Sequence, residues 1–236
     1  MADTIDARID ASRYDAITFD CYGTLIDWET GLSGYLQPLL GAHDCHVVES
    51  FLFDFYGRTE AAAQAGPYRP YRQILEAVLT ALGGRLGFRP SAQALAEFPQ
   101  SIGDWLPFPD TVPALKALAS RYQLGVISNI DDDLFELTQP RLEVELNHVV
   151  TAAQVGAYKP DPRPFKTAIT RIGVPQQRIL HVAQSLYHDI APASALGIDT
   201  VWIDRHDGHG SGATPSGTAT PTWKLRSLSE FVDALG

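Results

Sequence analysis

The feature that most constrains the fold is a regular alternation of apolar and helical segments in the second half of the chain. Four short strand-like runs recur there, at residues 124–128, 149–151, 179–183 and 200–203. Segments of helical character separate them, near 112–120, after 131 and from 164. Strands that alternate with helices form right-handed βαβ units and a parallel sheet. We therefore expect an α/β fold with helices on both faces of the sheet.

A long helical insertion is expected between the first strand and the rest of the sheet. The apolar run at 16–21 predicts that first strand, and apolar residues then recur at helical spacing at 47–56 and 74–82. The chain thus divides into a Rossmann-like core of residues 1–27 and 107–236 and an inserted helical cap of residues 28–106. Residues 207–222 are rich in Gly, Ser, Thr and Pro and predict a loop.

The composition limits the classes of partner. The 28 acidic and 18 basic residues give a net charge of −10 without any lysine or arginine block, so nucleic acids and anionic membranes are not expected partners. No stretch approaches the roughly 20 apolar residues of a membrane helix, and the N-terminus does not look like a signal peptide. Two cysteines predict neither a disulfide framework nor a zinc site. We expect a cytoplasmic protein.

Asp20 is the leading candidate for a catalytic residue. It follows the strand at 16–19 directly, and open α/β sheets place their ligands at the carboxyl ends of strands. Gly23 allows the backbone to turn sharply next to a ligand, and Thr24 adds a hydroxyl group beside the carboxylate. Taken alone, the same residues are equally consistent with a turn in which Asp20 is a cap.

Polar residues also follow the later strands. Ser128 and Asn129 end the second strand just before a predicted helix, where hydroxyl and backbone N–H groups form a natural anion site. Lys159 is followed by Pro160 and Pro162, which stiffen its loop, and Ser185 and Asp189 follow the strand at 179–183. Considered singly, these residues also fit a helix cap or a solvated surface.

Together, Asp20-x-x-Gly-Thr, Ser128, Lys159 and Asp189 resemble the four ordered motifs of the haloacid dehalogenase-like hydrolase superfamily. Phosphatases of that superfamily resemble Asp-x-Asp-Gly-Thr and Val-Gly-Asp-Ser-x-x-x-Asp, whereas this chain has Tyr22 and Gln184 in place of two acids. A halide leaving group needs no acid, and magnesium prefers carboxylate ligands. The chain therefore resembles the type II (L-2-haloacid) dehalogenases, with neither metal nor other cofactor expected.

This resemblance implies a role for each site residue. Asp20 displaces halide from C2 with inversion and forms an ester, whose carbonyl is attacked by water with help from Lys159 and Asp189. Thr24 and Ser185 order the polar network. A small anionic substrate is held by Ser128 and Asn129, with Tyr22 also at the substrate. The resemblance also suggests a homodimer.

Two features differ from well-known type II members. This chain has one extra residue between Gln184-Ser185 and the last aspartate, and Phe165 stands where those members carry tyrosine.

The cap should supply the halide contact. Arg58 is the first choice, with Arg69 and Arg72 as the other cationic candidates. Aromatic residues of the insertion and its borders are candidates for the apolar walls, namely Trp28, Tyr56, Tyr68, Tyr71 and Trp105.

Two alternatives stay open at this point. A phosphatase of the same superfamily would form an aspartyl-phosphate on Asp20 and should depend on metal. A non-catalytic binding or regulatory member would show no turnover at all.

Overall fold

The computed structural model describes residues 8–206 and 217–236. Within these residues six strands form one sheet in which every pair of neighbours is parallel. Across the sheet the strands are β3 (His148–Thr151), β2 (Gln123–Ser128), β1 (Ala16–Phe19), β4 (Ile179–Ala183), β5 (Asp199–Ile203) and β6 (Trp223–Leu225). The predicted parallel sheet is confirmed. The three-residue edge strand β6 was not predicted, because it follows a segment of loop-like composition.

The register brings the polar strand ends together. Phe19 of β1 pairs with Val126 of β2 and with Val182 of β4. β1 ends at Phe19, whereas β2 continues to Ser128 and β4 to Ala183, so Asp20 leaves the sheet beside the last residues of its two neighbouring strands. Asp20 is thus flanked by the ends of β2 and β4, as expected for the carboxyl edge of a parallel sheet.

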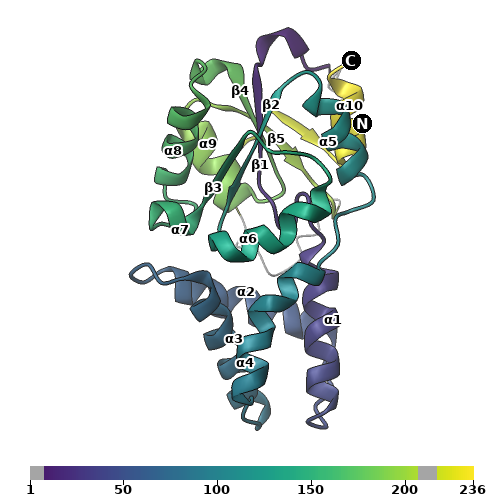
Figure 1. Ribbon diagram of the computed structural model, residues 1–236, viewed down its shortest axis with the longest axis vertical. Coiled ribbons are helices and arrows are strands. Elements are labelled where there is room, and N and C mark those ends of the chain that lie inside the picture. The colour runs from purple at the N-terminus through teal and green to yellow at the C-terminus, as the bar shows by residue number, and fades with distance from the viewer. Residues whose placement is uncertain (1–7, 207–216) are drawn as a thin grey trace.

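Helices cover both faces of the sheet, as Figure 1 shows. One face packs against α8 (Arg163–Ile172) and α9 (Ala191–Ala195), and the other against α5 (Thr111–Ala119) and α10 (Leu228–Ala234). Because the strands are covered on both sides, every residue of β1 and β4 is buried. The buried strands consequently read as continuous apolar runs rather than as alternating ones.

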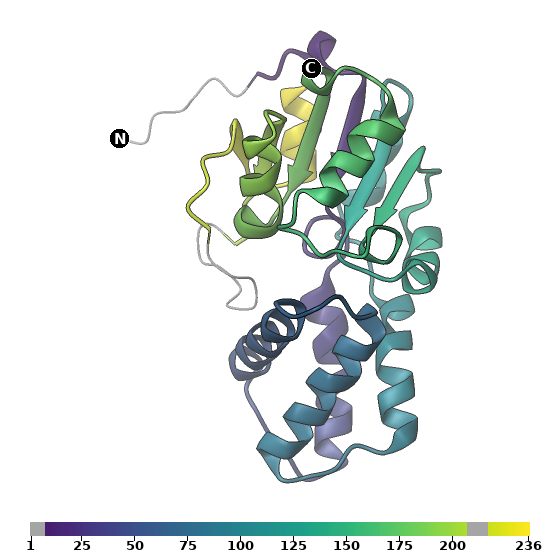
Figure 2. The ribbon, with the colours of Figure 1, turned by 90° about the vertical axis from the view of Figure 1, so that its left-hand side faces the viewer.

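Four long helices form the cap, which lies below the carboxyl edge of the sheet (Figures 1 and 2). They are α1 (Trp28–Gly41), α2 (Glu49–Gln64), α3 (Tyr71–Leu86) and α4 (Ala92–Gln100), and the 3₁₀ turn η2 (Ser101–Asp104) follows them. Asp27 caps α1 by accepting a hydrogen bond from the Thr30 amide at 3.1 Å, and Ser91 caps α4 by accepting one from the Ala94 amide at 3.0 Å. The fold is therefore a Rossmann-like core with an inserted helical cap.

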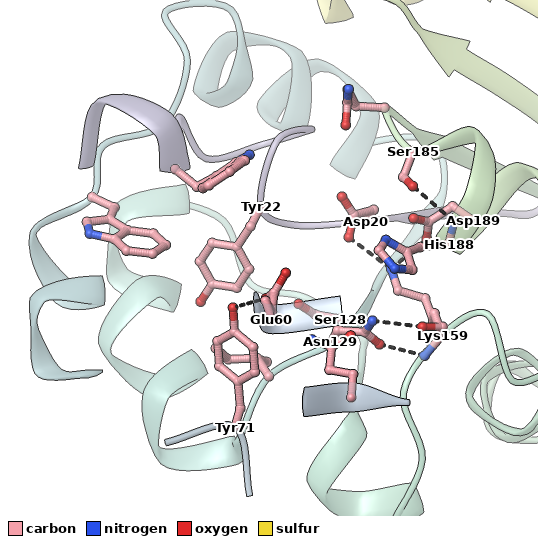
Figure 3. A pocket seen from close by; sticks show the side chains of 15 residues that line it. Asp20, Tyr22, Glu60, Tyr71, Ser128, Asn129, Lys159, Ser185, His188 and Asp189 are labelled. Atoms are coloured by element: carbon pink, nitrogen blue, oxygen red, sulfur yellow. Dashed lines mark hydrogen bonds and ion pairs between the residues drawn. The ribbon is translucent and has the colours of Figure 1, made fainter. Parts of the chain in front are cut away.

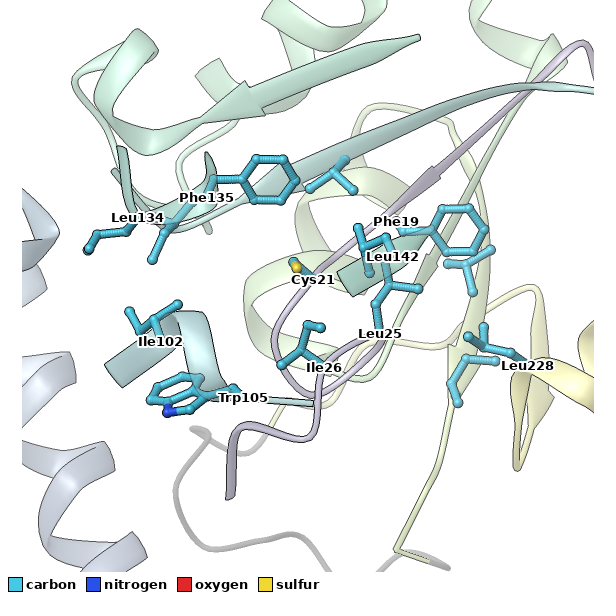
Figure 4. Packing of buried hydrophobic residues seen from close by; sticks show 14 of the residues in the cluster. Phe19, Cys21, Leu25, Ile26, Ile102, Trp105, Leu134, Phe135, Leu142 and Leu228 are labelled. Atoms are coloured by element: carbon cyan, nitrogen blue, oxygen red, sulfur yellow. The ribbon is translucent and has the colours of Figure 1, made fainter. Parts of the chain in front are cut away.

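The chain enters and leaves the cap through two adjacent segments. The Asp27 amide donates to the Leu106 carbonyl oxygen at 2.9 Å, and Ile26 pairs with Pro107. Figure 4 shows Ile26 and Cys21 packed with Trp105 and other apolar side chains at this junction. Cys21 is part of the buried core, and this burial raises the pKa of its thiol well above the usual range.

The remaining elements are short connections. They are η1 (Ala11–Arg13), α6 (Asp132–Thr138), η3 (Gln139–Leu142), α7 (Ala152–Val155), η4 (Gln176–Arg178) and the π-helical turn η5 (Leu186–Ile190). Of the predicted loop at 207–222, residues 217–222 contain neither helix nor strand, and residues 207–216 lie outside the described residues. None of the helices in the described ranges combines the length and hydropathy needed to cross a bilayer.

Candidate active site

Asp20 is held by hydrogen bonds on both carboxylate oxygens. Thr24 Oγ1 donates to Oδ2 at 2.8 Å, and Lys159 Nζ donates to Oδ1 at 2.9 Å. Thr24 Oγ1 also accepts from the backbone amide of Gln184 at 2.9 Å, which fixes the direction of its proton toward Asp20. Gly23 makes this tight turn with φ of +95°, a conformation that L side chains rarely adopt.

Lys159 is the central cation of the site. Its side chain is 1% exposed, and Nζ donates to Asp20 Oδ1, to Asp189 Oδ1 at 2.5 Å and to the Ile127 carbonyl oxygen at 2.7 Å. Asn129 holds the lysine backbone, since its Oδ1 accepts from Lys159 N at 2.7 Å and its Nδ2 donates to Lys159 O at 3.1 Å. The three hydrogen bonds from Nζ use all three N–H groups of the ammonium, which fixes its orientation.

Asp189 has a second buried partner that the sequence reasoning missed. His181 of β4 places Nε2 3.1 Å from Asp189 Oδ1, and its Nδ1 lies 2.9 Å from Thr18 Oγ1. An ionised carboxylate can only accept, so the proton must be on Nε2 of His181. The sequence signal that could have indicated this partner was His181 itself, the one histidine within the otherwise apolar strand β4.

The three charged groups differ in how strongly the site favours their charge. Burial raises the pKa of Asp20, and repulsion by the charge of Asp189 raises it further. Lys159 and Thr24 lower this pKa, but by less, so the net shift is upward. Burial also opposes the charge of Asp189, but Lys159 and His181 outweigh it and lower its pKa. Burial likewise opposes the Lys159 charge, yet the two carboxylates raise its pKa. Asp189 and Lys159 thus form a stable ion pair, and Asp20 is the more reactive carboxylate.

These groups open into a small cavity of about 80 Å³ between the sheet edge and the cap (Figure 3). It is lined by Asp20, Tyr22, Trp28, Glu60, Gln64, Tyr71, Trp105, Ser128, Asn129, Ile130, Lys159, Gln184, Ser185, His188 and Asp189. Of the predicted aromatic walls, Trp28, Tyr71 and Trp105 line it, whereas Tyr56 packs behind Trp28 and Tyr68 packs on Tyr158. The space suits a small ligand.

The predicted substrate-binding residues on the sheet all reach this cavity, but in different states. Ser128 Oγ is buried and has no hydrogen-bond partner among the described residues, so it is free to donate to a ligand. Asn129 has both polar side-chain atoms bound to the lysine backbone. Tyr22 pairs its hydroxyl with Thr138 Oγ1 at 2.8 Å and sets its ring edge against Trp105. Ser185 Oγ accepts from the amide of His188 at 2.9 Å.

The structure does not bring the predicted arginines to the cavity. Arg58 has 76% of its side chain exposed and pairs with Asp54 one helical turn away. Arg72 pairs with Asp133 at 2.5 Å, and Arg69 is exposed. Among the described residues that line the cavity, Lys159 is the only lysine or arginine. Arg58 therefore does not line the cavity in this structure, and its predicted halide contact has no support from the geometry.

The cap instead contributes an acid. Glu60 of α2 accepts from Tyr71 Oη at 2.5 Å, and Tyr71 Oη lies 2.7 Å from Tyr56 Oη. Burial, partly offset by the two tyrosine hydroxyl groups, raises the pKa of Glu60 to about 7. Figure 3 shows the second carboxylate oxygen of Glu60 pointing into the cavity toward Asp20. The carboxyl group of Glu60 therefore changes between its neutral and its charged form when the pH changes slightly around 7.

A buried aspartate fastens this part of the cap to the core. The carboxylate of Asp131, just after β2, accepts from the amides of Tyr71 at 2.8 Å and Arg72 at 2.9 Å. These are the first amides of α3, which have no partner inside the helix. Tyr158 adds a hydrogen bond from its hydroxyl to the Arg69 carbonyl oxygen at 2.7 Å. The Tyr71 side of the cavity is thereby tied to the sheet edge.

The donor set does not fit the magnesium ion that the phosphatase alternative would need. Lys159 Nζ lies within hydrogen-bond distance of both Asp20 and Asp189, so the space between the carboxylates holds an ammonium group. Gln184 and Tyr22 supply neutral groups where carboxylates would be needed. Within residues 8–206 and 217–236 there is no group of three or more His, Cys, Asp or Glu side chains set to hold a metal ion.

Comparison with known proteins agrees with this geometry. A family model described as haloacid dehalogenase-like hydrolase matches residues 14–197. The chain belongs to the haloacid dehalogenase-like hydrolase family. The motifs from Asp20 to Asp189 all lie within the matched part, so the family assignment rests on the same residues as the site.

Several relatives of this haloacid dehalogenase-like hydrolase align with most of its length. An (S)-2-haloacid dehalogenase of Pseudomonas putida is 26% identical over 218 residues, which are 91% of this chain and 93% of that protein. A haloacetate dehalogenase of a Moraxella species is 29% identical over 198 residues, 82% and 87% of the two chains. The solved L-2-haloacid dehalogenase of Xanthobacter autotrophicus superposes with a TM-score of 0.79 at 17% identity, covering 93% and 97%, and so shares the fold.

Proposed function

We propose that this hydrolase converts small 2-haloalkanoic acids into 2-hydroxy acids through an ester intermediate on Asp20, without a metal ion. The observation that carries the proposal is the buried cluster of Asp20, Lys159 and Asp189, with Thr24 on the second oxygen of Asp20. It presents one carboxylate of raised pKa to a small cavity and holds it with a fixed cation. The dehalogenase relatives over nine-tenths of the chain support the same chemistry.

In the first step Asp20 attacks C2 of the haloacid, the carbon–halogen bond breaks, and halide leaves. Hydrogen bonds from Thr24 and Lys159 hold the carboxylate in one orientation, so less entropy is lost on reaching the transition state. The leaving halide is a very weak base and needs no proton. The absence of an acid at Tyr22 is therefore compatible with this step, whereas an alkoxide leaving group would require one.

In the second step water attacks the carbonyl carbon of the ester. Lys159 Nζ lies 2.9 Å from Asp20 Oδ1 and can stabilise the negative charge that develops on that oxygen. Collapse of the tetrahedral intermediate releases the 2-hydroxy acid and restores Asp20. Because the attack is at the Asp20 carbonyl, the configuration at C2 changes only once, in the first step.

The substrate carboxylate is held by neutral donors in this proposal. Ser128 Oγ and Trp105 Nε1 are both buried donors without a partner among the described residues that line the cavity, while Asn129 acts indirectly by fixing Lys159. The helical cap, residues 28–106, encloses the reaction and contributes Trp28, Tyr71 and Glu60 to the cavity walls. A small, partly apolar cavity of this kind favours short-chain substrates.

The test is halide release from a panel of 2-haloacids, in both configurations at C2, measured in the presence of EDTA and beside hydrolysis of p-nitrophenyl phosphate. We expect free halide and one 2-hydroxy acid from one enantiomer, no phosphate, and no turnover by Asp20→Asn. Magnesium-dependent phosphate release without halide would instead establish a phosphatase, and the absence of turnover on all substrates would favour a binding or regulatory protein.

A further inference from the structure

The segment after β4 has an unusual backbone at the edge of the cavity. Residues Leu186–Ile190 form a single π-helical turn, which contains more residues per turn than an α-helix and occurs preferentially at functional sites. The Ser185 hydroxyl caps this turn by accepting from the His188 amide at 2.9 Å. The wide turn allows two consecutive residues, His188 and Asp189, to line the same cavity as Asp20.

We propose that His188 is the general base that activates the water in the second step. This assignment rests on the proposed dehalogenation and refines it, because the family resemblance gave the water-activating role to Lys159 and Asp189. Figure 3 shows the imidazole of His188 directed into the cavity beside Asp20 and Asp189. No hydrogen bond to either ring nitrogen of His188 is present within the described part of the chain, so the ring is available to a water molecule.

Asp189 is poorly suited to accept a proton at this step. Formation of the ester removes the charge of Asp20 and leaves Asp189 as the carboxylate partner of Lys159, whose side chain is 1% exposed. Protonating Asp189 would then break its buried ion pair with Lys159 and leave the ammonium with only the charge that develops on Asp20 Oδ1. The pKa of Asp189 is already lowered by Lys159 and His181 in the free enzyme.

Protonation of His188, in contrast, leaves the ion pair between Asp189 and Lys159 intact. Burial lowers its pKa to about 4, so the ring is neutral at working pH and has a lone pair to offer. As a base it is then no weaker than an ordinary carboxylate. Its protonated form would add a positive charge beside the ester at the moment when the tetrahedral oxygen becomes negative, and the two charges would stabilise each other.

The proton balance closes within the site. Water adds to the ester carbonyl carbon of Asp20 while one water proton moves to His188, and the carbonyl electrons move to the oxygen near Lys159. The intermediate then collapses, the bond to the substrate oxygen breaks, and His188 returns the proton to that oxygen. The 2-hydroxy acid leaves with a neutral hydroxyl group, and the Asp20 carboxylate and neutral His188 are restored.

The test is a pre-steady-state burst experiment with His188→Asn and excess 2-halopropanoate. We expect a burst of one equivalent of halide per enzyme, a steady-state rate reduced by about 10²-fold or more, and an enzyme whose mass has increased by one carboxyalkyl group on the peptide that contains Asp20. Added imidazole should restore part of the steady-state rate. Tyr187→Phe, on the exposed neighbour in the same turn, is the matched control and should turn over like the wild type.

The remaining outcomes distinguish a failure of the His188 proposal from a failure of the proposed function. A folded His188→Asn enzyme with wild-type steady-state turnover, or one that releases no halide even in the first turnover, would overturn the role of His188 in the second step. Absence of halide from the wild type on every haloacid would instead overturn the proposed function. Circular dichroism and thermal melting of the variants establish that the fold is intact.

Discussion

Removal of the buried lysine is the perturbation whose consequence the structure defines most sharply. In Lys159→Met the ammonium is lost from between Asp20 and Asp189, of which the second has 1% of its side chain exposed. Removing one partner of a buried ion pair typically costs about 3–5 kcal/mol of stability. We expect a loss of that size at pH 7, together with loss of turnover, because the remaining carboxylates would share a proton and Asp20 would no longer be a reliable nucleophile.

The pH dependence of this loss has a definite sign. In the wild type the lowered pKa of Asp189 contributes stability above its unfolded pKa, and this contribution is lost as the pH falls. In the variant the folded pKa of the carboxylate pair is raised, so stability is present at low pH and is lost as the pH rises. Both effects make the difference between the two proteins smaller near pH 4 than near pH 7.

The assay is urea unfolding of both proteins at pH 4.5 and pH 7, with Lys116→Met as the matched control. Lys116 pairs with Glu143 at 2.7 Å, but the two side chains are 54% and 58% exposed, and surface pairs contribute about 0–1 kcal/mol. Adding Asp189→Asn to Lys159→Met should recover part of the loss. A deficit below about 1 kcal/mol, or one of equal size at both pH values, would refute the reasoning about the buried cluster.

Three further predictions follow from the cavity. Dialysis against EDTA should leave halide release unchanged, because Lys159 occupies the space between the carboxylates; loss on chelation with recovery by Mg²⁺ would contradict this. KM for an anionic haloacid should rise as the pH passes through about 7, since ionised Glu60 repels the substrate, and Glu60→Gln should abolish that rise, as a KM profile from pH 5.5 to 8.5 would show. Arg58→Ala should leave kcat and KM unchanged in steady-state assays, because its side chain is 76% exposed and outside the cavity.

The sheet and its polar strand ends were predictable for a physical reason. Buried parallel strands need continuous apolar runs, and the alternation with helices fixes their direction, so residues that follow such runs must meet at one edge. Asp20 was found in this way, whereas Lys159 and Asp189 were assigned from the resemblance of their motifs to those of the superfamily. The structure brings all three into one hydrogen-bonded cluster. Their roles in catalysis stay predictions until kinetics are measured.

The contributions of the cap were harder to predict, because they depend on how separate helices pack. On α2 the residues Leu52, Tyr56 and Glu60 recur every four positions and so share one face of the helix. Arg58 lies two positions from Tyr56 and therefore on a different side, in solvent. The helical spacing therefore indicates that Arg58 faces away from Tyr56 and Glu60. The prediction of a halide contact rested on the charge of Arg58 and not on this spacing.

His188 and His181 illustrate a second limit. Neither a lone histidine in an apolar strand nor one in a helical segment indicates a site, because both are common in protein cores. Only the π-helical turn, which depends on the path of the backbone after Ser185, places His188 at the cavity.

The most direct test of the central claim follows the oxygen that enters the product. In a single turnover with excess enzyme in H₂¹⁸O, an ester on Asp20 that is cleaved at its carbonyl carbon gives an unlabelled 2-hydroxy acid and places ¹⁸O in the Asp20 carboxylate. Mass spectrometry of the product and of the peptide containing residue 20 measures both. Label in the hydroxy acid of the first turnover, with none in Asp20, would show direct attack by water and contradict the account.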